Sequence, residues 1–123
     1  MLGRMITRSF PILATPNLER IVAFYVGLLG GTISYRFPPT GAPAYVTIRL
    51  GASRIGFAAN EQAGPATERF DLCAYTKDVD VAVKKLRGAG VHILLEPADQ
   101  DWGERMARIA DPDGNRVTLF AGE

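Results

Sequence analysis

The stretch DWGERMARIADPDGNRVTLF, residues 101–120, holds the sharpest turn signal of the chain and its only tryptophan. In Asp111-Pro112-Asp113-Gly114, aspartate opens the turn as type I turns favour, proline fixes φ at the next position, and glycine tolerates a positive φ. Residues 106–110 and 116–120 on either side have the composition of strands. The stretch therefore predicts a β-hairpin, entered from a loop that contains Trp102 and Gly103.

The first half of the chain predicts a strand, a helix and three strands. We expect the first strand over residues 5–13. Thr15-Pro16 supplies an N-cap hydroxyl and a proline for the first helical position, and Gly30-Gly31 ends the helix. The later strands are expected over residues 32–37, 44–50 and 54–59. One helix face carries apolar residues at helical spacing, namely Leu18, Ile21, Val22, Tyr25, Leu28 and Leu29.

The second half repeats this order after a polar loop over residues 60–67. A strand is expected over residues 70–75, and Asp78 can cap a helix that ends at Gly88-Ala89-Gly90. Strands over residues 91–95, 104–110 and 115–120 complete the half, with a long loop over residues 96–103. The helix repeats the apolar spacing through Val79, Ala82, Val83 and Leu86.

Residue offsets support a duplication. Asn17-Leu18-Glu19 lies 61 positions before Asp78-Val79-Asp80, and Arg54-Ile55-Gly56-Phe57 lies 62 before Arg116-Val117-Thr118-Leu119. A unit of about 60 residues buries little core alone, so the two should pair their sheets around a groove. We therefore predict an α+β fold of two βαβββ modules in one domain over residues 1–123. Module one spans about residues 4–60, the linker about 61–67 and module two about 68–121.

Composition narrows the class of protein. The chain has 123 residues, 47% of them hydrophobic, and a net charge of +1 without a block of like charge, which favours a small-molecule or protein partner over nucleic acid or membrane. The single cysteine, Cys73, excludes an internal disulfide. No apolar run reaches the ~20 residues of a membrane span, and no signal peptide is recognisable. A cytoplasmic protein is expected.

Several motifs resemble the vicinal-oxygen-chelate superfamily, also called the glyoxalase/bleomycin-resistance/dioxygenase family. They are Asn17-Leu18-Glu19-Arg20 through Phe24-Tyr25 with Leu28-Leu29-Gly30, and Ala110-Asp111-Pro112-Asp113-Gly114-Asn115-Arg116. Trp102-Gly103-Glu104-Arg105 and Phe10-Pro11-Ile12-Leu13 resemble the bleomycin-resistance branch. The resemblance implies a homodimer with two ligand grooves.

The resemblance also implies where a divalent metal would bind in members that use one. The matching positions here are Phe10, Gly56, Asp71 and Thr118. Only Asp71 can ligate strongly, whereas a catalytic ion usually needs about three protein ligands. The sole histidine, His92, matches none of these positions and is expected at the surface or on an edge strand. We therefore predict neither a metal nor another cofactor.

Strand alternation assigns further side chains to faces. Ile55, Phe57, Val117 and Leu119 are expected in the core, and Tyr45, Thr47 and Arg49 on a face away from it. Cys73 is expected to be small and buried, and Glu104 and Arg105 to be exposed loop charges. The residues expected to face the groove are Phe10, Ile12, Asp71, Cys73, Tyr75, Met106, Arg108, Arg116, Thr118 and Phe120.

The function predicted is metal-independent binding or sequestration of a small, partly aromatic organic molecule, as in bleomycin-type antibiotic resistance. A neutral or anionic ligand fits the arginines as well as a cationic one does. No catalytic residue is assigned. The ligand-binding residues proposed are Phe10, Tyr45, Asp71, Trp102, Gly103, Met106, Arg108 and Thr118.

The sequence is compatible with other roles for these residues and with other functions. Trp102 either stacks on a ligand or plugs its loop onto the sheet, and Asp71 with the arginines can equally form a structural ion-pair network. The rival function is a glyoxalase-like or dioxygenase-like lyase or isomerase acting on a small metabolite. It would use a metal held by other ligands, or Asp71 or a tyrosine as acid or base. A third possibility is a structural or regulatory module without a ligand.

Overall fold

The structure, a computed structural model, describes residue 3 and residues 5–122, and these form two four-stranded sheets and two helical segments. The chain divides into two compact units, Met1–Ala63 and Gly64–Glu123. Each unit follows the order strand, helix, three strands, which confirms the predicted α+β class and its two βαβββ modules. Neither helix in the described part of the chain has the length and apolar character that crossing a membrane would require.

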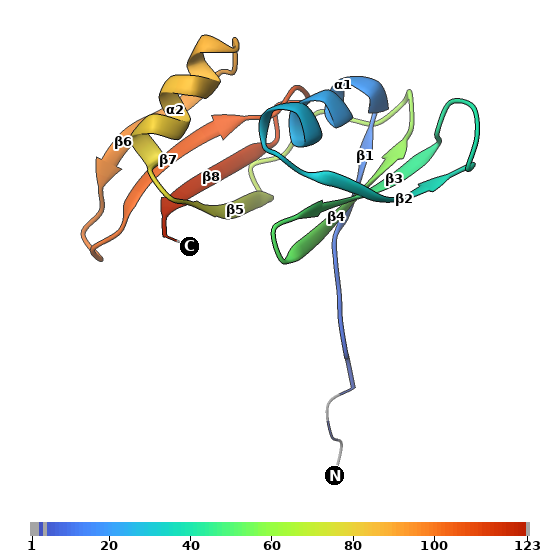
Figure 1. The fold of residues 1–123 in the computed structure, drawn as a ribbon, viewed down its shortest axis with the longest axis horizontal. Coiled ribbons are helices and arrows are strands. Elements are labelled where there is room, and N and C mark those ends of the chain that lie inside the picture. Colours follow the sequence, from blue (N-terminus) through green and yellow to red (C-terminus); the bar gives the residue numbers. More distant parts are fainter. Residues whose placement is uncertain (1–2, 4, 123) are drawn as a thin grey trace. The chain divides into compact units, whose positions relative to one another are not determined.

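The first unit is a sheet with its helix against one face (Figure 1). The strands lie in the order β1-β4-β3-β2, and β1 runs parallel to β4. The three strands that follow the helix lie within one residue of their predicted bounds. The elements are β1 (Ile12–Thr15), α1 (Leu18–Val22) with a π-helical continuation (Ala23–Leu28), β2 (Thr32–Phe37), β3 (Tyr45–Leu50) and β4 (Ser53–Ala59).

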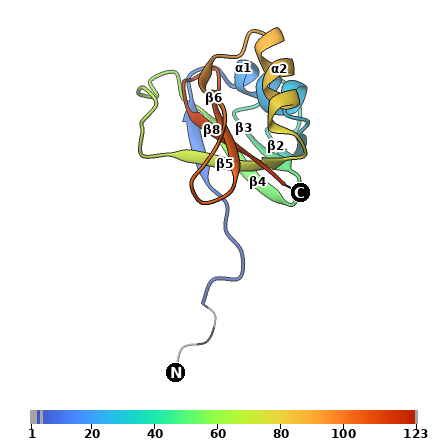
Figure 2. The ribbon, with the colours of Figure 1, turned by 90° about the vertical axis from the view of Figure 1, so that its left-hand side faces the viewer.

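The first strand starts later than predicted. The sequence predicts a strand over residues 5–13, but pairing with β4 begins only at Ile12, opposite Gly56, and β1 ends at Thr15. Pro11 has no backbone N–H to donate to a neighbouring strand. The segment before it extends away from the sheet in the two views of Figure 1 and Figure 2. Phe10 therefore precedes the strand on which it was expected.

The helix also begins later than predicted, because its cap is Asn17 and not Thr15. Asn17 Oδ1 accepts a hydrogen bond from the Arg20 N–H at 3.0 Å. The Thr15 hydroxyl instead accepts from the Asn17 N–H at 3.2 Å, a local turn that competes with helix entry. Pro16 consequently lies before the cap, outside the helix.

A π-helical turn changes which side chains of this helix are buried. The Phe24 carbonyl accepts from the Leu29 N–H at 3.0 Å, five residues on. The wider turn buries both Phe24 and Tyr25, whereas Leu28, which regular spacing assigns to the same face, is 43% exposed. The predicted apolar face of the helix is thus wrong at Leu28. It is confirmed at Leu18, Ile21 and Tyr25.

Aromatic rings form the centre of the first unit's core. Tyr25 is fully buried, and its ring centroid lies 5.0 Å from that of Phe24 and 4.9 Å from that of Phe57. The buried strand residues of this unit's core are Val46, Ile48, Ile55 and Phe57. The core assignment of Ile55 and Phe57 is therefore confirmed.

The second unit has the same organisation, with a helix covering one face of its sheet (Figure 1). Its strand order is β5-β8-β7-β6, with β5 parallel to β8. Asp78 caps the helix as predicted, since its Oδ1 accepts from the Val81 N–H at 3.1 Å. The elements are β5 (Asp71–Thr76), α2 (Val79–Gly88), β6 (Ile93–Asp99), β7 (Arg105–Ala110) and β8 (Arg116–Ala121). The core side chains are Val79, Val83, Leu86, Ala107, Ile109, Val117 and Leu119.

The edge strand β6 is longer than predicted. The sequence predicts a strand over residues 91–95 and a loop over residues 96–103, but β6 continues to Asp99. Its pairing with β7 shifts register between Ile93 and Leu95 and again between Leu95 and Ala98. Such bulges break the alternation by which a strand is recognised, and an edge strand tolerates Pro97. The connection that carries Trp102 is therefore a short turn and not a long loop.

The predicted hairpin turn between β7 and β8 is present and is held by a buried carboxylate. Asp111 is only 4% exposed. Its Oδ1 accepts from the backbone N–H groups of Asp113 at 2.9 Å and Asn115 at 2.8 Å, and its Oδ2 accepts from Asn115 Nδ2 at 2.9 Å. Gly114 has φ of +88°, which glycine adopts without strain. This turn sets the register of the two central strands of the sheet.

Candidate functional site

The face of the second sheet opposite α2 carries alternate residues of three adjacent strands. Asp71, Cys73 and Tyr75 of β5 lie beside Arg116, Thr118 and Phe120 of β8. On the other side of β8, Ala110, Arg108 and Met106 of β7 pair with the same three residues. We call this surface the β5–β8–β7 face. It has a charged end at Asp71 and Arg116 and an aromatic end at Tyr75 and Phe120.

A carboxylate with three partners forms the charged end. Asp71 Oδ1 accepts from the Thr118 hydroxyl at 2.6 Å, and Asp71 Oδ2 accepts from Arg108 Nη2 at 3.2 Å. Arg108 Nε also donates to Thr118 Oγ1 at 2.9 Å, which closes a triangle of side chains. Arg116 Nη2 lies 3.6 Å from Asp71 Oδ2. The four residues therefore share one face, as the alternation predicts.

Arg116 uses its donors less fully than Arg108 does. Its contact with Asp71 is an ion pair longer than an ordinary hydrogen bond. Its Nε is buried without a hydrogen-bond partner within the described residues. The side chain is only about a quarter exposed, at 29%. The charged end thus combines one carboxylate with two guanidinium groups, one of which has unused donors.

Cys73 occupies the middle of the face. The sequence predicts a buried cysteine, but Cys73 is exposed, because it lies beside Thr118 on the face of the sheet opposite α2. Partial desolvation, followed by the negative charge of Asp71, raises the pKa of its thiol, and the two arginines oppose this shift. The raised pKa keeps the thiol protonated near neutral pH and argues against a nucleophilic role.

Two rings form the aromatic end. The Tyr75 and Phe120 centroids are 5.9 Å apart, and Tyr75 is 60% exposed. Met106 pairs with Phe120 on the neighbouring strand, and β7 continues from it toward the turn that carries Trp102. An apolar surface at this end remains open to solvent.

Trp102 lies in the turn between β6 and β7 and is 62% exposed. Its indole Nε1 donates to Glu104 Oε1 at 2.7 Å. Gly103 has φ of +100° and donates its N–H to the Gln100 carbonyl at 2.9 Å, so the turn requires glycine there. The indole is not a plug buried on the sheet; it is an exposed ring oriented by a carboxylate.

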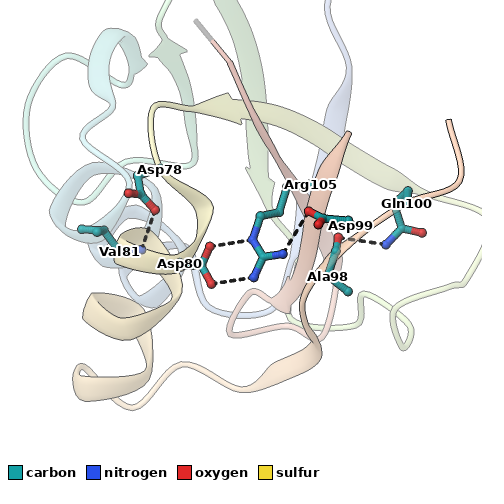
Figure 3. A network of polar contacts seen from close by, with 7 residues as sticks. All are labelled: Asp78, Asp80, Val81, Ala98, Asp99, Gln100 and Arg105. Carbon is teal, nitrogen blue, oxygen red and sulfur yellow. Dashed lines mark hydrogen bonds and ion pairs between the residues drawn. The ribbon is translucent and has the colours of Figure 1, made fainter. Parts of the chain in front are cut away.

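Arg105 joins this hairpin to the helix, as Figure 3 shows. Its Nε and Nη2 donate to the two carboxylate oxygens of Asp80 at 2.6 and 2.9 Å, and its Nη1 donates to Asp99 Oδ1 at 3.0 Å. The bond from Arg105 lowers the pKa of Asp80. The prediction of an exposed loop charge is therefore wrong for Arg105, which is the first residue of β7. It is also wrong for Glu104, which is half-buried and accepts from Trp102.

Tyr45 and Phe10 lie in the first unit. The Tyr45 hydroxyl is 2.8 Å from Thr47 Oγ1, so these two side chains share a face of β3 as predicted. A Cβ on Gly56 would lie only 2.3 Å from the Tyr45 hydroxyl oxygen, so the phenol occupies the space beside that glycine. Phe10 is about half exposed ahead of β1. Both aromatic side chains remain candidates for ligand contact in their own unit.

The side chains at the family's metal positions do not fit a divalent ion. Phe10 offers only carbon, and the space beside Gly56 is filled by a phenol. The Asp71 carboxylate already binds a hydroxyl and a guanidinium, and positive charge beside it disfavours a cation. Within residues 5–122, no group of three or more His, Cys, Asp or Glu side chains could hold a metal. His92 is exposed just before β6, as expected.

The structure thus brings together Asp71, Arg108 and Thr118 of the proposed site, and Met106 lies two residues away on the same face of β7. Tyr75, Phe120 and Arg116 belong to the same surface, although only strand alternation indicates them in the sequence. The Arg105–Asp80 pair has no sequence signal, because it joins residues 25 positions apart through tertiary structure.

Comparison with known proteins gives consistent matches. The model of the Glyoxalase/Bleomycin resistance protein/Dioxygenase superfamily matches residues 7–119. The bleomycin resistance protein of Klebsiella pneumoniae is 26% identical in an alignment 122 positions long. The alignment covers 89% of this chain and 92% of that protein. The crystal structure of a bleomycin-binding protein complexed with bleomycin has a TM-score of 0.70 at 23% identity, covering 96% of this chain and 100% of that one.

A further relative is longer than this chain. The anthracycline biosynthesis protein DauV of Streptomyces sp. (strain C5) is 28% identical in an alignment 122 positions long, which covers 88% of this chain. The match covers 44% of that protein, so the chain spans less than half of its length.

Proposed function

This chain belongs to the glyoxalase/bleomycin resistance protein/dioxygenase superfamily, and we propose that it binds a small, partly aromatic organic molecule without using a metal ion. Its work is capture of the ligand and not turnover. The ligand lies on the β5–β8–β7 face, with its ring at the aromatic end and its polar part toward Asp71, Arg108 and Thr118. Met106 and the Trp102–Gly103 turn extend the aromatic end.

The observation that carries the proposal is an open apolar surface next to a charged cluster on one rigid sheet. Tyr75 is 60% exposed although its ring centroid lies only 5.9 Å from that of Phe120. Ligand sites commonly combine such apolar area with a few fixed polar groups that set orientation. The triangle of Asp71, Arg108 and Thr118 supplies fixed groups, because each side chain holds the other two.

Metal independence is supported by the same cluster. The carboxylate that could ligate an ion, that of Asp71, accepts hydrogen bonds from Thr118 and Arg108. A cation bound to this carboxylate would lie beside the guanidinium groups of Arg108 and Arg116, whose positive charge repels it. A bleomycin-binding relative in structural comparison and a bleomycin resistance protein in sequence comparison support capture of an organic ligand. Protection against a toxic compound is the physiological role that we propose.

A homodimer is part of the proposal. The first sheet leaves large apolar side chains about half exposed, and burial in a second copy would remove them from water. They are Ile12, Ile33, Tyr35 and Phe37. Light scattering of the purified protein measures the mass, and a value equal to the 13.3 kDa of one chain would contradict the dimer.

A thermal-shift screen of planar aromatic compounds on chelator-treated protein tests the function. We expect at least one compound to raise the melting temperature, because a ligand at 100 times its Kd stabilises the folded state by about 2.7 kcal/mol. Trp102→Ala should weaken the binding of that compound, since stacking between two aromatic rings contributes about 0.5–1.5 kcal/mol. Val81→Ala, which removes an exposed apolar side chain from α2, is the matched control and should leave the shift unchanged.

Three outcomes would count against the proposal. If the shift is lost after chelation and returns with a divalent ion, the binding depends on metal. If mass spectrometry shows that the compound is converted to a product, the protein is an enzyme. Equal ligand-induced shifts of the melting temperature in the wild type and in Trp102→Ala would show that Trp102 does not contact the ligand.

A further inference from the structure

The charge of the β5–β8–β7 face identifies the ligand more closely. Its charged end holds Arg108, Arg116 and Asp71, and within the described residues these are the charged groups on the alternate positions of β5, β7 and β8 that form the face. Asp71 compensates one guanidinium, so one positive charge remains at an end that is only about a quarter exposed. A positive charge in a partly desolvated place favours an anionic partner.

The hydrogen bonds indicate which of the two arginines carries the uncompensated positive charge. Arg108 makes two hydrogen bonds on the face, donating to both Thr118 and Asp71. Arg116 has only the 3.6 Å ion pair with Asp71, and its buried Nε has no acceptor within the described residues. The Arg116 side chain is 29% exposed, so a ligand on the face can reach the part of this side chain that is open to solvent, whereas the buried Nε stays out of its reach. A guanidinium with free donors is well shaped for a carboxylate.

The spacing of the face fits a small molecule with a ring at one end. Arg116 lies four residues from Phe120 along β8, and strands rise about 3.3 Å per residue. The charged end is therefore about 13 Å from the aromatic end along the strands. A two-ring aromatic acid, together with its hydrogen bond to the guanidinium, spans most of this distance.

Resting on the proposed function, we propose that the β5–β8–β7 face selects an aromatic acid, with Arg116 as the group that receives the ligand's carboxylate or comparable anion and Tyr75 and Phe120 as the surface for its ring. Asp71 then acts as a charge filter. Its carboxylate disfavours doubly charged anions and holds Arg108 in place, while Arg116 stays available.

Three probes that share one ring system test this selection: 2-naphthoate, neutral 2-naphthamide and the cation 2-naphthylmethylammonium. Their dissociation constants for the full chain are measured by titration of backbone amide NMR signals, which also show whether residues of β5 and β8 respond. We expect 2-naphthoate to bind at least about tenfold more tightly than the amide, because a charge-assisted hydrogen bond is involved.

Variants distinguish an arginine that binds the anion from one that only supports the fold. Arg116→Gln should weaken the binding of 2-naphthoate about tenfold and leave the binding of 2-naphthamide unchanged. Arg116→Lys should keep part of the preference for 2-naphthoate. Lys84→Gln removes the same charge from the exposed surface of α2 and should have no effect. Asp71→Asn should tighten the binding of 2-naphthoate severalfold, because it removes a negative charge that repels the ligand. If the ion-pair cluster has only a structural role, this substitution should instead weaken binding.

Two kinds of failure are distinguishable. Equal affinity for the three probes, or preference for the ammonium compound, would overturn the anion selection while binding to the aromatic surface stands. Absence of binding by all three probes at millimolar concentration would overturn the inference together with the aromatic site on which it rests.

Discussion

Phe57→Ala is expected to lower the free energy of unfolding by about 3–5 kcal/mol, the range for removing a buried aromatic side chain. Phe57 is fully buried on β4, and its ring lies 4.9 Å from the centroid of Tyr25. The substitution removes both the transferred apolar area and the ring contact, and it leaves a cavity between the helix and the sheet. Urea unfolding followed by circular dichroism measures the change.

Ile6→Ala is the control for this prediction. It deletes an apolar side chain from the segment before β1, where Ile6 is 67% exposed, and should change stability by no more than about 0.5 kcal/mol. Similar losses for the two variants would contradict the described core of the first unit.

Asp111→Ala is expected to cost about 2–3 kcal/mol, because hydrogen bonds to a charged group are strong and their buried partners would be left unsatisfied. The carboxylate accepts from two backbone N–H groups and from the amide of Asn115. Alanine offers none of these acceptors, so the turn between β7 and β8 loses its side-chain support. The same unfolding measurement applies.

Asp101→Ala is the control for charge and residue type. Asp101 is exposed in the turn between β6 and β7, and its removal should change stability by no more than about 0.5 kcal/mol. A loss at Asp111 as small as that at Asp101 would mean that the backbone alone holds the hairpin.

The fold was predictable because local signals and the duplication agreed. The Asp-Pro-Asp-Gly turn, the Asp78 cap and the alternation in residues 116–120 are each decided by neighbours in sequence. The errors occur where tertiary structure overrides such signals. The π-helical turn exchanges Leu28 for Phe24 on the buried face, and bulges in β6 conceal a strand that continues to Asp99.

The candidate site was predictable in part, through strand alternation. That rule groups Asp71, Arg108, Arg116 and Thr118, whose side chains do meet. It does not show which face is solvated, so Cys73 was expected to be buried although it is exposed. It also gives no information about Arg105, whose partner Asp80 lies on the helix.

The most direct test of metal-free binding on the β5–β8–β7 face uses Cys73 as a reporter. It is the only cysteine of the chain, it is exposed, and it lies between the charged and aromatic ends. We measure the rate at which iodoacetamide alkylates chelator-treated protein at fixed pH, with and without 2-naphthoate. At ten times its Kd the probe should slow alkylation about tenfold, following its occupancy of the site. An unchanged rate under conditions where 2-naphthoate is bound, or protection that requires an added divalent ion, would contradict the account.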